Sequence, residues 1–392
     1  MLQSHFQVTC PCCRSCNLKS FYKQDSVPVN SVVVIENRNH ALSYPEGDIE
    51  LFGCEQCGFV NNQHFDPDLV TYDDSYEEPQ GFSSTFQKYQ SDLAEELIST
   101  CDIRNKYVVE IGCGKGEFLN AICSLGNNRG LGYDPVFDPI RISLPTNVVV
   151  KKTMFDSNES LENADLVCCI MTLEHVFRIT ELIADIRTSI GDSATKLYFQ
   201  VPNAERIFNL GAFHDIYYEH CSYFTENSLR QLFSHTGFKV IEISQRYQGQ
   251  YLGLLAEPTT KADNDIAYRP NYPSQPLATW GANLIQKREA MNNIISESKQ
   301  NGESIALWGG GSKAVSLLNI LNQPTWIDIV IDINPRKHNT FLPGTGHKVV
   351  NVDYLINNNI GLLIIMNPIY EIEIQNQISS MNIPLPRILS LN

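Results

Sequence analysis

Residues 108–119, VVEIGCGKGEFL, have the composition of a ligand-binding turn. A run of β-forming residues ends in three alternating glycines, Gly112, Gly114 and Gly116, and a helical pattern follows directly. Glycines let the backbone approach a ligand without a Cβ in the way, and they present amides at a helix N-terminus. A dinucleotide loop is the alternative, but its fingerprint is G-x-G-x-x-G, and Phe118 lies near the place expected for the third glycine.

Two acidic residues flank this turn. Glu110 precedes the first glycine, and Asp134 in RGLGYDP ends the next strand pattern, about 20 residues on, where a carboxylate can bind a ribose. The E-x-G-x-G-x-G turn resembles the first motif of class I S-adenosylmethionine-dependent methyltransferases. That resemblance implies S-adenosylmethionine as the cofactor, with the adenine near Phe155. The candidate cofactor-binding residues are Glu110, Gly112, Cys113, Gly114, Asp134, Pro135 and Phe155.

The most polar aromatic segment of the chain is FHDIYYEHCSYF, residues 213–224. It follows a fifth strand pattern, KLYFQVPN, and no helix or strand period accounts for it. Its histidines, carboxylates and tyrosines are costly to bury without a purpose, although a solvated loop with aromatic anchors is an equal alternative. The segment supplies His220, Glu219 and Tyr217 as candidate catalytic residues, and His175 joins them from the end of the fourth strand pattern, residues 166–171.

Six of the twelve cysteines lie in TCPCCRSC and FGCEQCGF. Two C-x-x-C knuckles about 40 residues apart predict a zinc ribbon, and four thiolates leave no open position, so the site is expected to be structural. The first knuckle allows Cys10/Cys13 or Cys13/Cys16. We prefer Cys10 and Cys13, because CPCC-RS-x-NL is similar to the common CPxC-GS-x-NL knuckle. The expected ligands of Zn²⁺ are therefore Cys10, Cys13, Cys54 and Cys57.

Composition limits the function classes. The chain has 392 residues and a net charge of −15. The length suggests two or three domains, and the acidic balance argues against nucleic acid and against an anionic membrane surface as partners. Residues 1–6 do not form a signal peptide, and no apolar run is long enough to cross a membrane. We therefore expect a cytoplasmic protein, a monomer or homodimer, with its thiols reduced.

The elements follow in a modular order. Ser83 or Ser84 is expected to cap an amphipathic helix through Thr100, and alternating strand and helix patterns then predict a parallel sheet. Tyr76, in the acidic segment before that helix, is a further catalytic candidate, with packing at a domain boundary as the alternative. The expected domains are a zinc-binding module (1–75), a methyltransferase domain (76–256), a linker and helix (257–300) and a Rossmann-like domain (301–392).

A second glycine turn opens the last domain. SIALWGGGSKAVSLLNIL again has the pattern of a strand, a glycine loop and a helix, now with Lys313 in the turn. IDIVIDINP and NIGLLIIMNP add two strand patterns. We expect this unit not to repeat the first, because the combination of carboxylate and glycines does not recur. The predicted fold class is thus α/β, a class I methyltransferase domain flanked by a zinc ribbon and a second Rossmann-like domain.

This order resembles the sugar-nucleotide C-methyltransferases, which install branched methyl groups on deoxysugars, over essentially the whole chain. The family's I-Y-H-E-H-x-S-Y-F loop matches residues 216–224, with Tyr218 where a histidine is usual. Its G-A-x-x-K and D-x-N-P-x-K-x-G-x-x-x-P-G-T elements match residues 309–313 and 332–345, again with substitutions. The resemblance implies a nucleotide-linked sugar as the substrate.

A sugar carbon is nucleophilic only when a neighbouring ketone acidifies its proton, so a 4-keto sugar methylated at carbon 3 is the expected substrate. His220 is expected to be the base, and Tyr217, Glu219 and His175 are expected to orient it or to stabilise the enolate. Lys313 and its glycine turn are expected near the nucleotide diphosphate. An O-methyltransferase that acts on a sugar or natural-product hydroxyl is the alternative function.

Overall fold

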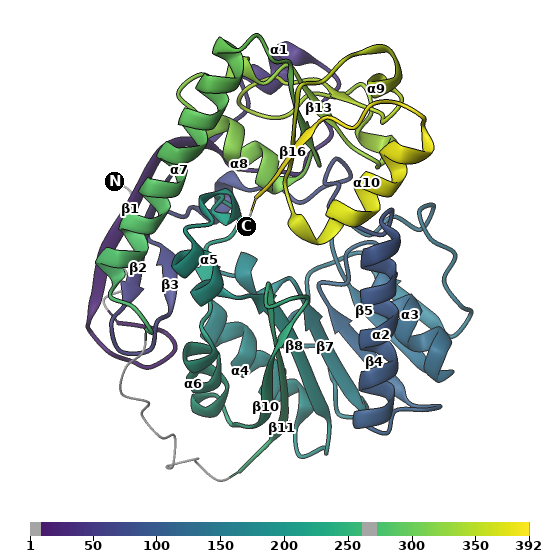
Figure 1. Cartoon of the computed structure of the whole chain (residues 1–392). Coiled ribbons are helices and arrows are strands. Elements are labelled where there is room, and N and C mark those ends of the chain that lie inside the picture. Colours follow the sequence, from purple (N-terminus) through teal and green to yellow (C-terminus); the bar gives the residue numbers. More distant parts are fainter. Residues whose placement is uncertain (1–8, 261–272, 392) are drawn as a thin grey trace.

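The computed structural model describes residues 9–260 and 273–391, whose strands form three sheets (Figure 1). The first six residues and part of the expected linker lie outside the described residues. A four-stranded sheet carries the N-terminal module, a seven-stranded sheet forms the middle of the chain, and a five-stranded sheet forms the C-terminal part.

The N-terminal sheet has the order β1-β2-β3-β9. Its first three strands are antiparallel, and the short helix α1 (Arg38–Leu42) lies between the first two: β1 (Leu18–Pro28), β2 (Glu46–Cys54) and β3 (Val60–Asn62). The fourth strand, β9 (Ser222–Tyr223), comes from the polar segment in the middle of the chain and pairs with β3. The cysteine module is therefore joined by backbone hydrogen bonds to the segment that contains His220.

The middle sheet has the order β10-β11-β8-β7-β4-β5-β6, and only β11 runs antiparallel to its neighbours. Its strands are β4 (Tyr107–Ile111), β5 (Arg129–Tyr133), β6 (Val148–Lys151), β7 (Leu166–Ile170), β8 (Lys196–Pro202), β10 (Phe238–Arg246) and β11 (Tyr251–Pro258). The central strands are buried over nearly their whole length, and β7 is apolar throughout, as expected of a parallel sheet with helices on both faces. This arrangement confirms the predicted fold class.

The helices of this unit are α2 (Ser84–Thr100), α3 (Glu117–Gly126), α4 (Ile179–Ile190), α5 (Ala204–Leu210) and α6 (Glu226–His235). Helix α2 begins as predicted, since the Ser83 side chain accepts a hydrogen bond from the Phe86 amide. Helix α3 starts at the third glycine of the first turn, so its N-terminus faces the carboxyl end of β4. A ligand crevice is expected there, because the strand order reverses at β4. The chain continues to β5 on one side of β4 and later returns to β7 on its other side.

The C-terminal sheet has the order β14-β13-β12-β15-β16, and all its strands are parallel. Its strands are β12 (Ile305–Trp308), β13 (Ile329–Ile331), β14 (Val349–Val350), β15 (Leu362–Ile365) and β16 (Arg387–Ser390), and its helices are α8 (Ser312–Ile320), α9 (Tyr354–Asn357) and α10 (Glu371–Ser380).

Helix α7 (Leu277–Gln300) leads into this unit and ends at Gln300, where the expected linker and helix also end. It packs so closely on β1 that a Cβ at Gly281 would lie 2.4 Å from the Phe21 carbonyl oxygen. Trp280, also in α7, stacks on Phe208 of α5, with ring centroids 5.0 Å apart. The helix therefore joins the N-terminal sheet to the middle unit. Within the described ranges, no helix is long and apolar enough to cross a membrane.

The expectation that the C-terminal unit lacks the carboxylate of the first unit is wrong. Asp134 Oδ2 accepts a hydrogen bond from the Gly114 amide at 2.7 Å, and Asp332 Oδ2 accepts one from the Gly310 amide at 2.7 Å. The other oxygen of each carboxylate accepts from the amide two residues further on, at 2.8 and 2.7 Å. The sequence did not reveal this likeness, because the aspartate lies in DINP in the C-terminal unit and in YDP in the first unit. In each of the two units, an aspartate that follows the second strand thus fixes the glycine turn that follows the first.

Candidate active site

The first glycine turn requires glycine at two positions. Gly112 has φ +72° and Gly114 has φ +54°, a region that side chains with a Cβ rarely adopt. A Cβ at Gly112 would lie 2.2 Å from Thr172 Oγ1, and one at Gly114 would lie 2.7 Å from Glu78 Oε1. The turn is therefore closely covered by the end of β7 on one side and by the segment before α2 on the other.

The carboxyl groups at this turn are buried. Glu110 is 2% exposed, and its Oε2 has no hydrogen-bond partner among the residues that the structure describes. Burial, with the nearby Asp134 charge, raises the pKa of Glu110 to about 8. Burial also raises the pKa of Asp134, although the amides of Val136 and Gly114 oppose the shift. Buried carboxyls beside a glycine cradle fit the ribose hydroxyls and the ammonium group of S-adenosylmethionine.

The other candidate cofactor residues lie around the same crevice. Cys113 is buried within the turn, and Pro135 follows Asp134 directly. Phe155 packs edge-on against Tyr133 at the end of β5, with ring centroids 5.5 Å apart. The structure thus brings the predicted cofactor residues to the carboxyl ends of β4 and β5.

The predicted catalytic residues converge beside the end of β7. The rings of His175 and His220 are perpendicular, with centroids 4.7 Å apart, and the Tyr217 ring centroid lies 4.1 Å from that of His220. Burial lowers the pKa of His175 to about 4. Burial holds the pKa of His220 well below its usual range, and the neighbouring His175 and Lys313 lower it further. Both imidazoles are therefore neutral at pH 7, and His220 Nδ1 has no hydrogen-bond partner within the described chain.

The Glu219 carboxylate forms its hydrogen bonds with residues other than His220. Its Oε2 accepts from the Tyr76 hydroxyl at 2.8 Å, and its Oε1 accepts from the Ser31 hydroxyl at 3.0 Å and from the Ser31 amide. Burial raises the pKa of Glu219, and these three hydrogen bonds oppose the shift. Tyr76 is thus a hydrogen-bond donor in the site. The segment is buried rather than solvated, which excludes the alternative of a solvated loop.

Three residues of the site were not among the sequence candidates. Glu174 is fully buried with both carboxylate oxygens unpartnered in the described structure, and burial raises its pKa to about 8. Tyr72 places its hydroxyl 3.1 Å from His175 Nδ1. Ser31 bonds to Glu219 and, at 2.8 Å, to Ser312 of the second glycine turn. Adjacency to His175 pointed to Glu174, but nothing in the sequence signals Ser31.

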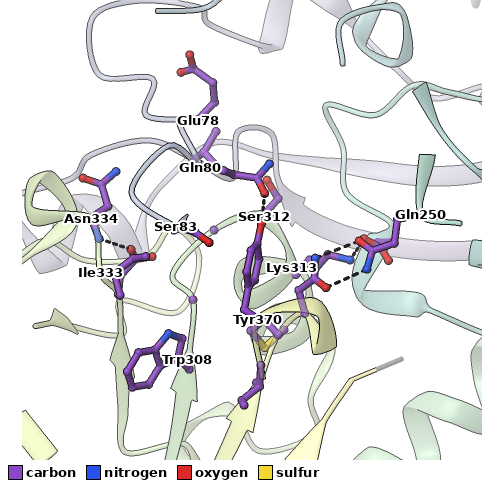
Figure 2. A pocket seen from close by; sticks show the side chains of 18 of the residues that line it. Glu78, Gln80, Ser83, Gln250, Trp308, Ser312, Lys313, Ile333, Asn334 and Tyr370 are labelled. Atoms are coloured by element: carbon purple, nitrogen blue, oxygen red, sulfur yellow. Dashed lines mark hydrogen bonds and ion pairs between the residues drawn. The ribbon is translucent and has the colours of Figure 1, made fainter. Parts of the chain in front are cut away.

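A cavity of about 250 Å³ lies between the two α/β units (Figure 2). Met171 at the end of β7, Tyr217 and His220 line it from the middle unit. The C-terminal unit contributes the ends of β12, β13 and β15, including Trp308 and Asp332. This cavity at the strand ends of the C-terminal unit, called the second crevice below, therefore reaches the predicted catalytic histidine.

Lys313 has an acidic partner that the sequence did not indicate. Its ammonium group forms a short hydrogen-bonded ion pair with Asp215, in the 3₁₀ turn Phe213–Asp215 at the start of the polar segment. The reciprocal amide pair of Gln250 and Asn367, at 2.9 and 3.0 Å, also joins the two units. Lys313 still lines the cavity, but its charge is largely balanced by Asp215.

The cysteine cluster has the geometry of a tetrahedral metal site. The sulfur atoms of Cys10, Cys13, Cys54 and Cys57 all lie within 4.8 Å of one another, with Cys10 to Cys57 and Cys13 to Cys54 at 3.5 Å. Four thiolates at about 2.3 Å from one Zn²⁺ have similar sulfur separations, so the cluster fits zinc. Cys16 is exposed and outside the cluster, in agreement with the preferred knuckle.

Comparison with protein families gives two matches. Residues 85–243 match a family model described as a methyltransferase domain, and residues 272–383 match one described as a C-methyltransferase C-terminal domain. The first match agrees with the strand order of the middle sheet and with its glycine turn. The chain is therefore an S-adenosylmethionine-dependent methyltransferase with a C-methyltransferase C-terminal domain. No curated protein sequence matches the chain.

Solved structures resemble only part of the chain. A putative S-adenosylmethionine-dependent methyltransferase from Listeria monocytogenes is 13% identical, with a TM-score of 0.36, over 44% of this chain and 99% of its own. A putative O-methyltransferase from Nostoc punctiforme is 18% identical, with a TM-score of 0.37, over 44% and 56%. The CurJ carbon methyltransferase is 12% identical, with a TM-score of 0.35, over 45% and 56%. At these identities and TM-scores, the similarity to solved structures adds nothing to the assignment of the protein class.

Proposed function

We propose that the protein transfers a methyl group to carbon 3 of a nucleotide-linked 4-keto deoxysugar. The observation that carries this proposal is the position of His220. It lines one cavity together with Met171, which follows the strand beside the first glycine turn, and with the strand ends of the C-methyltransferase C-terminal domain. A base in that position lies between a methyl donor and a substrate held by the second unit.

The proposed chemistry begins with the carbon 3 proton. The ketone at carbon 4 acidifies it, and His220 takes it as a neutral imidazole, leaving an enolate. The enolate oxygen needs a hydrogen-bond donor, and burial keeps the Tyr217 hydroxyl protonated by raising its pKa well above the usual value. If the Tyr72 hydroxyl donates a hydrogen bond to His175 Nδ1, the ring proton of the neutral His175 lies on Nε2. Nε2 can then donate a second hydrogen bond to the enolate oxygen.

The cofactor residues are those of the first crevice. Glu110 and Asp134 would bind the cofactor beside Gly112 and Gly114, and Phe155 would lie near its adenine. The bound cofactor supplies an electrophilic methyl group on a sulfonium. The chain contributes the positions of these groups and a site with little solvent, since Glu174 and His220 are buried and His175 is half-buried.

The second crevice is the proposed place of the nucleotide. Asp332 lies after β13 as Asp134 lies after β5, so it is suited to bind a second ribose. Support also comes from Gly309 and Gly311 of the turn before α8, which line the cavity next to a helix N-terminus. The four cysteines hold a structural zinc in this proposal. The proposed domains remain residues 1–75, 76–256, 257–300 and 301–392.

Incubation with methyl-labelled S-adenosylmethionine and a panel of 4-keto nucleotide sugars tests the proposal. Matched sugars with a 4-hydroxyl group in place of the ketone are the control. We expect label on carbon 3 by product NMR, and only with the ketones. Label on an oxygen of the 4-hydroxyl sugars would contradict the proposal and favour the O-methyltransferase alternative.

A further inference from the structure

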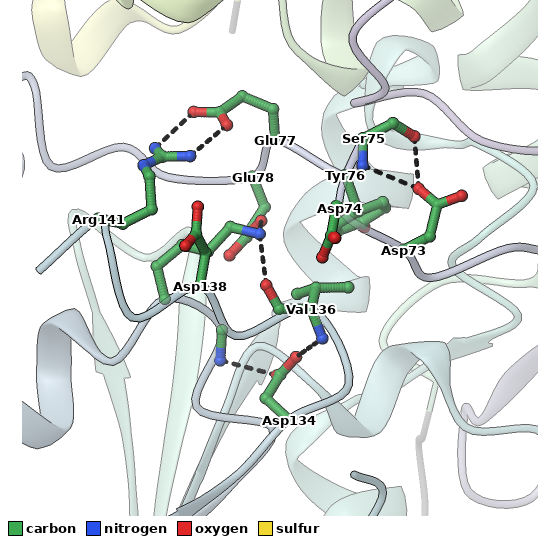
Figure 3. Close-up of polar contacts among 12 residues, drawn as sticks. Asp73, Asp74, Ser75, Tyr76, Glu77, Glu78, Asp134, Val136, Asp138 and Arg141 are labelled. Carbon is green, nitrogen blue, oxygen red and sulfur yellow. Dashed lines mark hydrogen bonds and ion pairs between the residues drawn. The ribbon is translucent and has the colours of Figure 1, made fainter. Parts of the chain in front are cut away.

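Glu78 lies over the first glycine turn, although it comes from the segment between the N-terminal sheet and α2 (Figure 3). Its Oε1 lies 2.7 Å from the position that a Cβ at Gly114 would occupy. Its Oε2 is buried and has no hydrogen-bond partner in the part of the chain that the structure describes. Glu78 also lines the cavity that reaches His220. A carboxylate oxygen without a hydrogen-bond partner thus lies between the first glycine turn and the cavity that His220 lines.

The neighbours of Glu78 are held firmly. Glu77 accepts two hydrogen bonds from Arg141, at 2.6 and 2.8 Å (Figure 3). It also accepts one from Asn334, at 2.8 Å. Tyr76 is bonded to Glu219. Because the residues before Glu78 are anchored on the middle unit, the C-terminal unit and the polar segment, its position over the turn is fixed by the fold.

One buried cation accompanies this carboxylate. Lys115 is 4% exposed, and its ammonium group lies 3.8 Å from Glu78 Oε2 and donates to the Val136 carbonyl oxygen at 2.7 Å. At 3.8 Å the Glu78 carboxylate and the ammonium are an ion pair without a hydrogen bond. The turn therefore presents one anionic and one cationic group side by side, which complements the ammonium and the carboxylate of an amino acid.

We propose that Glu78 binds the α-ammonium group of the methionine end of S-adenosylmethionine. This inference rests on the proposed binding of the cofactor at the first glycine turn. Glu78 is a cofactor-binding residue in this account, and it takes no part in proton transfer. Lys115, beside it, is left to face the α-carboxylate.

Isothermal titration with three ligands tests this inference. S-adenosylmethionine and S-adenosylhomocysteine both carry the amino-acid end, whereas 5′-methylthioadenosine has the adenosine and the thioether but no amino-acid end. Glu78→Gln keeps the shape of the side chain and removes its charge. We expect the variant to bind the first two ligands roughly ten- to a hundredfold more weakly and 5′-methylthioadenosine as well as the wild type does.

Glu95→Gln, an exposed change on α2, is the matched control and should leave the binding of all three ligands unchanged. Unchanged binding of S-adenosylmethionine by Glu78→Gln would overturn the inference while leaving the cofactor site intact. An equal loss for all three ligands would also overturn it, because it would mean that the turn itself is distorted. If the wild type bound none of the ligands, the proposed cofactor site would fail as well.

Discussion

The ion pair of Glu77 and Arg141 gives a prediction about how the site is held together. Its two side chains are 4% and 10% exposed, and the pair is bidentate, at 2.6 and 2.8 Å. Asn334 from the C-terminal unit donates to the same carboxylate. Arg141→Gln removes the cation and leaves the Glu77 carboxylate buried with one neutral partner.

The expected cost follows from burial. Removing one partner of a buried ion pair costs about 3–5 kcal/mol, because the remaining charge is uncompensated. The Asn334 hydrogen bond persists in the variant, so we expect a loss at the lower end, about 3 kcal/mol in the free energy of unfolding. Arg246 and Glu96 make an equally short bidentate pair, at 2.6 and 2.7 Å, but their side chains are 21% and 45% exposed. Arg246→Gln should therefore cost only about 0–1 kcal/mol.

The pH dependence gives a second readout. Burial alone raises the pKa of Glu77, but hydrogen bonds from Arg141 and Asn334 outweigh it and hold the pKa below its usual value. In Arg141→Gln we expect the effect of burial to outweigh that of the remaining hydrogen bond. The pKa of Glu77 then rises above its value in the unfolded chain, about 4.3. The native variant then binds a proton that its unfolded chain does not, and its stability increases as the pH falls toward that value. The gap to the wild type should therefore narrow on acidification.

Urea unfolding of the wild type and both variants, at about pH 8 and about pH 5.5, measures these quantities. Equal losses for Arg141→Gln and Arg246→Gln would refute the argument from burial. A gap between the wild type and Arg141→Gln that is constant or widens on acidification would refute the account of the Glu77 charge.

The remaining predictions concern the metal and the cofactor. Metal analysis should find one zinc per chain, retained in Cys16→Ser and lost in Cys10→Ser, and the reverse pattern would show that the other knuckle binds the metal. Asp134→Ala should weaken S-adenosylmethionine binding by about 1.5–3 kcal/mol, because it removes charged hydrogen bonds to the ribose; an unchanged affinity by calorimetry would count against that role. Lys313→Ala should spare cofactor affinity, since its ammonium pairs with Asp215 on the other side of the cavity.

Local patterns were sufficient to predict most of the fold. The Ser83 cap of α2, the end of α7 and the glycine turn after β4 follow from rules that depend on neighbouring residues alone. The paired C-x-x-C spacing likewise limited the metal ligands to two sets, because each knuckle is a local turn. The resemblance of the first knuckle to CPxC-GS-x-NL then selected the set whose sulfurs gather.

The rest depended on contacts between distant segments. The pairing of β9 with β3 has no periodic signal, since it involves two residues of an irregular segment. Ser31 and Glu78 have ordinary sequence surroundings, and only the packing of three sheets brings them to the site. The packing of distant segments also pairs Lys313 with a carboxylate, which the glycine-rich sequence around Lys313 did not predict.

The thiolate cluster is connected to the catalytic segment by the same packing. The Thr225 hydroxyl donates to the Cys57 carbonyl oxygen at 2.7 Å, and the Asn62 amide donates to the Cys221 carbonyl oxygen at 3.0 Å. These bonds hold the chain directly after His220. The cysteine module is therefore part of the frame that positions the proposed base.

The central claim is that His220 removes the carbon 3 proton, and exchange of that proton with heavy water tests it most directly. The account predicts that the wild type exchanges the proton of a 4-keto nucleotide sugar. It predicts that His220→Ala binds both ligands nearly normally, loses this exchange, and turns over roughly 10² to 10⁴ times more slowly. Exchange that persisted in His220→Ala and disappeared in His175→Ala would contradict the claim and assign the base to His175.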